Sequence, residues 1–213
     1  MLRCSTSLWS ADLADLAAEI RRVEPYSDRF HLDVFDGHYQ PVLLFFPDLV
    51  EALRRHTHLP FEVHLMTSDP LLWIGPFADA GADIVLCQFD TMRDPREAIE
   101  TARAADVGFG IALGLDDPID VLDPYWPDLD LVTIVGTELG VKGSDLDQRV
   151  PGKIRQARTE ASRRGVQTEI QVDGGIRRHT VPLLHEAGAD WIVPGSLMFA
   201  GDPAELRAWL ASL

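Results

Sequence analysis

The chain has 213 residues, of which 46% are hydrophobic and 25% are charged. This composition is ordinary for a globular protein and excludes collagen-like, low-complexity and disordered classes. The 19 basic residues against 34 acidic ones leave a net charge of −15. Because such a surface repels nucleic-acid phosphates and anionic lipids, we expect neither nucleic acid nor membrane as a partner.

The first 20 residues bear on the cellular compartment. They contain three carboxylates and lack the apolar stretch of a signal peptide, and no apolar run in the chain approaches the length of a membrane span. The two cysteines, Cys4 and Cys87, suggest neither a CxxC pair nor a disulfide framework. We therefore expect a cytoplasmic protein.

Short apolar runs alternate with helical patterns along the chain. Most of the runs are continuous, as in parallel strands that are buried on both faces. We predict strands over residues 3–9, 29–34, 61–66, 83–89, 107–113, 129–135, 168–172 and 191–193. We predict helices over residues 11–23, where Ser10 is the expected N-cap, and over 47–55, 70–80, 95–105, 117–125, 151–164, 179–187 and 203–213.

Eight β/α units within residues 1–213 favour a single-domain (β/α)8 barrel. The alternative is an open doubly wound sheet, which lacks support because no strand is followed by G-x-G-x-x-G. In a barrel of this kind, functional residues lie at the C-terminal ends of the strands.

Four polar residues stand near such strand ends. His31 and Asp33 are two apart and so share one face of the second strand, while His64 and Asp173 end the third and seventh strands. Burying them unpaired would be costly, and a divalent metal with mixed nitrogen and oxygen ligands would remove that cost. Any one of them alone is more often a hydrogen-bonded structural group, so the spacing leaves both readings open.

Glycine-bearing loops follow the last three predicted strands. Gly174 and Gly175 follow the seventh strand, and Gly195 and Ser196 follow the eighth. Barrel loops at these two places commonly present backbone N–H groups to a phosphate. The loop 136–143, after the sixth strand, could fold over the ligand.

Five segments resemble the ribulose-phosphate 3-epimerase family. They are SLWSAD at 7–12, HLDVFDGH at 31–38, VHLM at 63–66, VDGGI at 172–176 and GS at 195–196. The H-x-D-V-x-D-G-H block combined with V-D-G-G-I is highly specific, and the segments follow the family's order across nearly the whole chain. The resemblance implies an α/β fold, a single (β/α)8 TIM barrel of the ribulose-phosphate-binding type, and a homo-oligomer.

The resemblance also implies the chemistry. It implies a metal-dependent 3-epimerase of phosphorylated ketoses, first of all ribulose 5-phosphate and xylulose 5-phosphate, with an enediolate intermediate. It implies Asp33 and Asp173 as the acid/base pair, and one divalent ion (Zn, Fe, Mn or Co) on His31, Asp33, His64 and Asp173. It places Ser7 and Met66 near the substrate, and the phosphate on Gly174, Gly175, Gly195 and Ser196.

The chain departs from the family's pattern around this centre. Residues 135–144 read VGTELGVKGS where the family usually has a run like MTVNPGFGGQ, and the end of the fourth strand reads QFD in place of H-x-E. These differences leave open an epimerase of a different ketose phosphate. A sugar-phosphate decarboxylase or aldolase is less favoured because its D-x-K-x-x-D run is absent, and a non-catalytic binder is less favoured because all four ligand positions are retained.

We call the segment 135–144 the divergent loop. We expect its residues Gly140, Lys142 and Gly143 to contact the substrate. The Lys142 ammonium could reach the phosphate or a distal hydroxyl through a charge-assisted hydrogen bond, or it could remain a solvated loop lysine. The sequence leaves both roles for Lys142 open.

Overall fold

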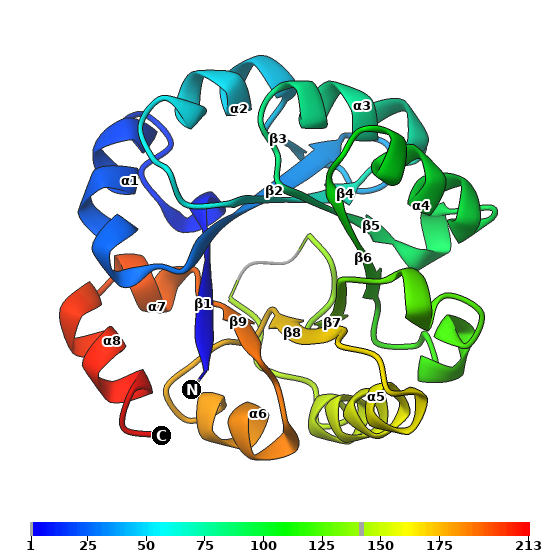
Figure 1. Cartoon of the computed structure of the whole chain (residues 1–213). Helices are drawn as coiled ribbons and strands as arrows, with labels where there is room; N and C mark the ends of the chain where they lie inside the picture. Colours follow the sequence, from blue (N-terminus) through cyan, green and yellow to red (C-terminus); the bar gives the residue numbers. More distant parts are fainter. Residues whose placement is uncertain (1, 141–142) are drawn as a thin grey trace.

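A computed structural model describes residues 2–140 and 143–213. In these ranges eight parallel strands close into a barrel, since β1 pairs with both β2 and β9 (Figure 1). The predicted (β/α)8 barrel is therefore confirmed. Its strands are β1 (Arg3–Ser7), β2 (Arg29–Asp36), β4 (Phe61–Met66), β5 (Ile84–Gln88), β6 (Gly108–Leu113), β7 (Leu131–Val135), β8 (Glu169–Asp173) and β9 (Trp191–Val193).

The helices surround this ring of strands (Figure 1). They are α1 (Leu16–Val23), α2 (Pro47–Arg54), α3 (Leu71–Asp79), α4 (Pro95–Ala104), α5 (Val150–Arg164), α6 (Val181–Ala187), α7 (Ser196–Phe199) and α8 (Pro203–Leu210). The glycines that follow α5 and α6, Gly165 and Gly188, adopt the left-handed conformation that ends a helix.

The beginning of the first helix was predicted wrongly. The strand β1 ends at Ser7, the residues Leu8–Ser10 form a 3-10 helix, and α1 begins only at Leu16. Its N-cap is Asp15, whose carboxylate accepts a hydrogen bond from the Ala18 N–H at 3.3 Å. Aspartate and serine are both good N-caps, so composition alone did not distinguish the two positions.

The predicted helix over residues 117–125 is also wrong. The chain instead forms two 3-10 helices, Ile119–Leu122 and Trp126–Asp128. Three prolines, Pro118, Pro124 and Pro127, punctuate this segment. Each removes a backbone donor and disfavours the helical conformation of the residue before it, which leaves room only for single turns.

One short strand was not predicted at all. The two residues of β3 (Leu43–Leu44) pair antiparallel with the end of β2. A two-residue strand carries no periodicity that a sequence pattern could reveal. The pairing holds the long connection between β2 and α2 against the edge of the barrel mouth.

The alternation of side chains along the strands builds two cores. Phe30 and Leu32 of β2 belong to the large core between the strands and the helices. The interior of the barrel holds a smaller apolar cluster of Leu86, Leu131 and Trp191. Because successive side chains point to opposite faces, His31 and Asp33, which alternate with Phe30, Leu32 and Val34, turn inward.

Gly110 shows how tightly the interior is filled. A Cβ at Gly110 would lie 2.3 Å from the Leu86 side chain and 2.7 Å from the Leu131 carbonyl oxygen. We expect Gly110→Ala to lower the free energy of unfolding by about 1–3 kcal/mol, because the backbone must shift to relieve the contact. The matched variant is Gly152→Ala on α5, where an added Cβ would have no neighbour within 4 Å. Its free energy of unfolding should rise by up to about 1 kcal/mol. Urea titrations that show equal stability for the two variants would contradict this packing.

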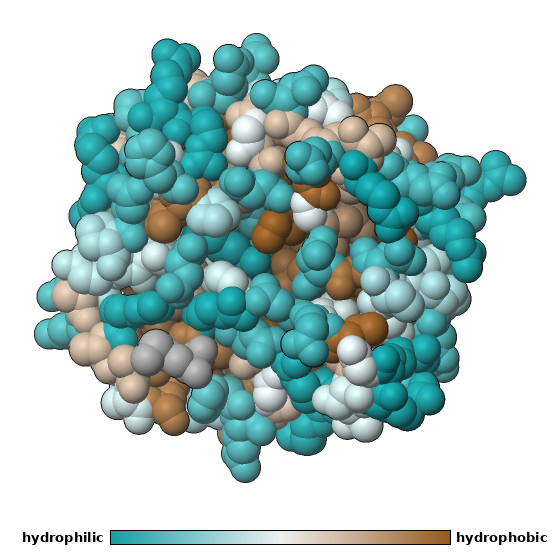
Figure 2. Space-filling model, viewed as in Figure 1, coloured by the Kyte–Doolittle hydropathy of each residue, from teal (hydrophilic) through white to brown (hydrophobic). Residues whose placement is uncertain are grey.

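The surface in the view of Figure 1 is mainly hydrophilic, with small apolar patches (Figure 2). Three of the exposed large apolar side chains are Leu43, Phe46 and Leu72. In the described ranges, no helix is both long enough and apolar enough to cross a membrane.

Candidate active site

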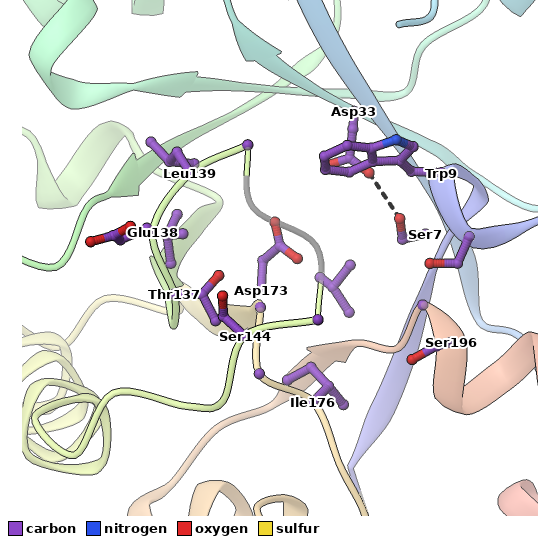
Figure 3. A pocket seen from close by; sticks show the side chains of 18 of the residues that line it. Ser7, Trp9, Asp33, Thr137, Glu138, Leu139, Ser144, Asp173, Ile176 and Ser196 are labelled. Atoms are coloured by element: carbon purple, nitrogen blue, oxygen red, sulfur yellow. Dashed lines mark hydrogen bonds between the residues drawn. The ribbon is translucent and has the colours of Figure 1, made fainter. Parts of the chain in front are cut away.

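A cavity of about 350 Å³ opens at the C-terminal ends of the strands (Figure 3). This volume suits a small ligand. The loops that follow β1, β7, β8 and β9 form most of its wall. The strand residues that line it include Ser7, Asp33, Met66, Val135, Asp173 and Val193. The structure thus brings the expected Ser7 and Met66 to the same pocket as the two aspartates.

The two histidines lie beneath these aspartates. His31 and His64 are fully buried, and one ligand atom from each of His31, Asp33, His64 and Asp173 lies within 4.8 Å of the others. The His31 Nε2 atom is 3.3 Å from Asp33 Oδ1 and 3.7 Å from Asp173 Oδ2. The register of β2 with β4 pairs Asp33 with His64, which brings the candidate ligands of these two strands together.

The charges within the cluster stabilise one another. Burial alone would raise the pKa of Asp33, but His31, His64 and the Ser7 hydroxyl lower it below its ordinary value. Burial alone would lower the pKa of His31, yet the Asp33 and Glu62 carboxylates raise it well above its ordinary value. The same carboxylates that favour a proton on His31 would favour a bound cation.

Three buried nitrogen atoms of the two histidines are free to bind a metal ion. His31 Nε2 and both ring nitrogens of His64 are buried and have no hydrogen-bond partner within the part of the chain that the structure describes. A buried polar atom without a partner costs about 1–3 kcal/mol. Imidazole nitrogens and carboxylate oxygens at this mutual distance form a ligand set that Zn²⁺ and related divalent ions accept. The four residues therefore fit a divalent metal.

A network of hydrogen bonds joins the segments that follow β2 and β4. Asp36, at the end of β2, accepts from the N–H groups of His38 and Tyr39 at 2.9 Å and from the N–H and hydroxyl of Ser68 at 2.7 Å. Partial burial opposes ionisation, but these bonds hold the pKa of Asp36 well below its usual range. Asp36 therefore ties the loop after β2 to the loop after β4.

The four residues expected at the phosphate, Gly174, Gly175, Gly195 and Ser196, all line the pocket. Gly175 has φ +69°, and a Cβ there would lie 2.6 Å from the Leu146 Cα. Glycine is needed at this position because another residue would push the backbone of the two loops apart.

The divergent loop reaches the same cavity. Gly140 and Gly143 both line it. Lys142 lies outside the described residues, so both of its possible roles stay predictions.

Several lining residues were missed by the sequence reasoning, and Arg177 is the basic one among them. Arg177 lines the pocket and donates hydrogen bonds to the carbonyl oxygens of Ile176 at 3.0 Å and Ser144 at 3.4 Å. It thereby joins the loop after β8 to the loop after β7. A basic residue two positions after Gly175, in a loop already assigned to a phosphate, was the signal that could have revealed it.

Residues 3–199 match the sequence profile of the Ribulose-phosphate 3 epimerase family. The chain belongs to this family. It is 36% identical over 201 residues to the ribulose-phosphate 3-epimerase of Bacillus subtilis, which covers 93% of each chain. It is 38% identical over 199 residues to that of Treponema pallidum, which covers 92% of this chain and 90% of the relative. The family member described here is accordingly an epimerase.

Solved structures support the fold of this epimerase. An orotidine 5′-phosphate decarboxylase from Pyrococcus horikoshii superposes with a TM-score of 0.69 at 16% identity, over 97% of this chain and 96% of that one. A mutant tryptophan synthase alpha-subunit from Pyrococcus furiosus gives a TM-score of 0.67 at 18% identity, over 99% and 94%. At such low identity these likenesses show the barrel alone.

Proposed function

We propose that this epimerase inverts carbon 3 of a phosphorylated ketose, with ribulose 5-phosphate and xylulose 5-phosphate as the first candidate pair. The observation that carries the proposal is the convergence of Asp33 and Asp173 in one pocket above two buried histidines. Membership of the family and the names of its relatives support the same reaction.

The two aspartates are the proposed acid/base pair. They enter the pocket from different strands, Asp33 from β2 and Asp173 from β8 (Figure 3). One carboxylate removes the proton from carbon 3, and the other delivers a proton to the opposite face. The Ser7 hydroxyl donates to Asp33 Oδ2 at 2.8 Å, which orients that carboxylate and favours its ionised form.

The proposed cofactor is one divalent ion, Zn, Fe, Mn or Co. His31, Asp33, His64 and Asp173 would hold it. When bound, such an ion supplies Lewis-acid stabilisation of the negative charge that develops as carbon 3 loses its proton. Both imidazole side chains of this ligand set are fully buried.

The opposite end of the pocket is the proposed phosphate site. Gly174 and Gly175 would contact the phosphate from the loop after β8, and Gly195 and Ser196 from the loop after β9. Met66 would pack against the carbon chain between the two ends. Gly140 and Gly143 would cover it from the divergent loop.

A different ketose phosphate is the second candidate substrate. The specific observation behind it is that Thr137, Glu138 and Leu139, from the segment that departs from the family's usual run, line the cavity. These side chains would meet the part of the ligand that differs among ketoses. The homo-oligomeric state and the cytoplasmic location stay predictions.

A screen of phosphorylated tetruloses, pentuloses and hexuloses with the zinc-loaded enzyme tests the proposal. We expect the highest kcat/KM for ribulose 5-phosphate and little activity on ribulose without its phosphate. A higher kcat/KM for a ketose of another length would move the assignment to that substrate. Turnover of none of them, or cleavage of a carbon–carbon bond, would exclude a ketose-phosphate 3-epimerase.

A further inference from the structure

Charged side chains fill the barrel directly below the candidate ligands. Arg29 begins β2 and Glu62 is the second residue of β4, and their side chains are 2% and 0% exposed. Gln171, from the middle of β8, is also fully buried. Charged residues are rarely buried unless they are paired. Each of these side chains should therefore have an ion-pair or hydrogen-bond partner inside the barrel.

Glu62 is the centre of this layer. Its Oε1 atom lies 2.5 Å from the Nδ1 atom of His31 and accepts a hydrogen bond from Gln171 Nε2 at 2.6 Å. Its Oε2 atom forms an ion pair with Arg29 Nη2 at 2.5 Å. The same Arg29 nitrogen donates to Gln171 Oε1 at 2.6 Å. Three side chains, two from β2 and one from β8, therefore hold one carboxylate in place.

The contacts determine which His31 nitrogen carries the hydrogen. A carboxylate paired with an arginine can only accept hydrogen bonds, so the His31 Nδ1 atom facing it must donate. The lone pair of a neutral His31 ring then resides on Nε2, which is the nitrogen that faces Asp33 and Asp173. A metal-ligating histidine is commonly fixed in this way by an acceptor on its other nitrogen.

The second histidine of the cluster has no such support. Neither ring nitrogen of His64 has a hydrogen-bond partner among the described residues. Of the two rings, only that of His31 therefore has a hydrogen-bond partner among the described residues that fixes its tautomer.

Glu62 also balances the charge of Arg29. The Arg29 guanidinium stacks on the Trp191 ring, 3.7 Å from its centroid, and approaches Glu169 at 3.9 Å. Without Glu62, a buried positive charge would stand directly below a site for a divalent cation. The carboxylate thus both orients His31 and screens the ligand cluster from Arg29.

We propose that Glu62, held by Arg29 and Gln171, is a positioning residue that presents His31 Nε2 to the metal. This inference rests on the proposed function, in which His31 is a ligand. Glu62 does not line the pocket, so its effect should be seen in metal affinity and in the tautomer of the His31 ring.

The test compares Glu62→Gln with Thr133→Val as its matched control. Thr133 lies in the same buried layer and its hydroxyl accepts from Gln171 Nε2 at 3.1 Å, but it does not contact His31. Zinc affinity is measured by competition with a chromophoric chelator. We expect Glu62→Gln to weaken zinc binding about 10- to 100-fold and Thr133→Val to leave it essentially unchanged.

Nitrogen-15 NMR of the histidine rings in the zinc-loaded wild type needs no variant and covers the case in which Glu62→Gln does not fold. We expect His31 to carry a proton on Nδ1 and zinc on Nε2. Zinc on Nδ1 of His31, or equal zinc affinity in wild type and Glu62→Gln, would overturn the role of Glu62 while leaving the metal-dependent epimerase intact. A wild type that binds no zinc or other divalent ion would overturn the proposed metal centre, and this inference with it.

Discussion

Asp33→Asn and Asp173→Asn should each lower the rate of epimerisation by about 10²- to 10⁴-fold. An amide has nearly the shape of a carboxylate but cannot accept the proton from carbon 3, so each variant removes one of the two proposed acid/base groups. The two variants need not behave alike. We expect the carboxylate that remains to keep exchanging the carbon-3 hydrogen of one epimer with solvent, while neither variant forms the other epimer.

The matched control for these variants is Asp90→Asn. Asp90 is an exposed carboxylate that accepts hydrogen bonds from the Tyr39 hydroxyl at 3.0 Å, and it does not line the pocket. The turnover of the Asp90→Asn variant should stay essentially that of the wild type. Zinc content is measured for every variant, so that loss of metal is separated from loss of the base. Near-normal epimerisation by either Asp33→Asn or Asp173→Asn would remove that residue from the mechanism.

His64→Ala should abolish most metal binding and activity together. Removal of a group that only contacts a ligand costs about 10- to 100-fold in metal affinity, and removal of a ligand itself should cost more than about 100-fold. Elemental analysis after dialysis gives the bound zinc, and kcat/KM is measured on the same sample. An excess of zinc in the assay should restore part of the activity if the three remaining ligands can still hold the ion.

The control for His64→Ala is His58→Ala. His58 is an exposed histidine that follows α2, outside the ligand cluster. The His58→Ala variant should keep the zinc content and the kcat/KM of the wild type. Full zinc occupancy with normal turnover in His64→Ala would show that the buried histidine is a packing residue.

The barrel could be predicted because its signals are local. Buried parallel strands leave continuous apolar runs, and those of β4 and β9 were predicted with the bounds that the structure gives. The candidate ligands could be predicted as well, since the two-residue spacing of His31 and Asp33 fixes their common face whatever the rest of the chain does. Their convergence with His64 and Asp173 required the barrel and its register.

The groups below and around the cluster could not be predicted in the same way. Glu62 lies within an apolar strand, and nothing local shows that its partners are Arg29 and Gln171, which are 33 and 109 positions away. Arg177 joins the pocket only because the loops after β7 and β8 lie side by side. Such contacts depend on the order and register of strands. A charged residue in an apolar strand nevertheless predicts that some partner exists.

The most direct test of the account follows the hydrogen on carbon 3. Ribulose 5-phosphate is incubated with the zinc-loaded enzyme in D₂O, and the ketoses are observed by proton NMR. We expect xylulose 5-phosphate to appear with deuterium at carbon 3 and with every carbon–carbon bond intact, because the proton that is removed and the one that is returned belong to different carboxylates. Xylulose 5-phosphate that keeps the original hydrogen at carbon 3, or a substrate that shows neither exchange nor epimerisation, would contradict a two-base mechanism at Asp33 and Asp173.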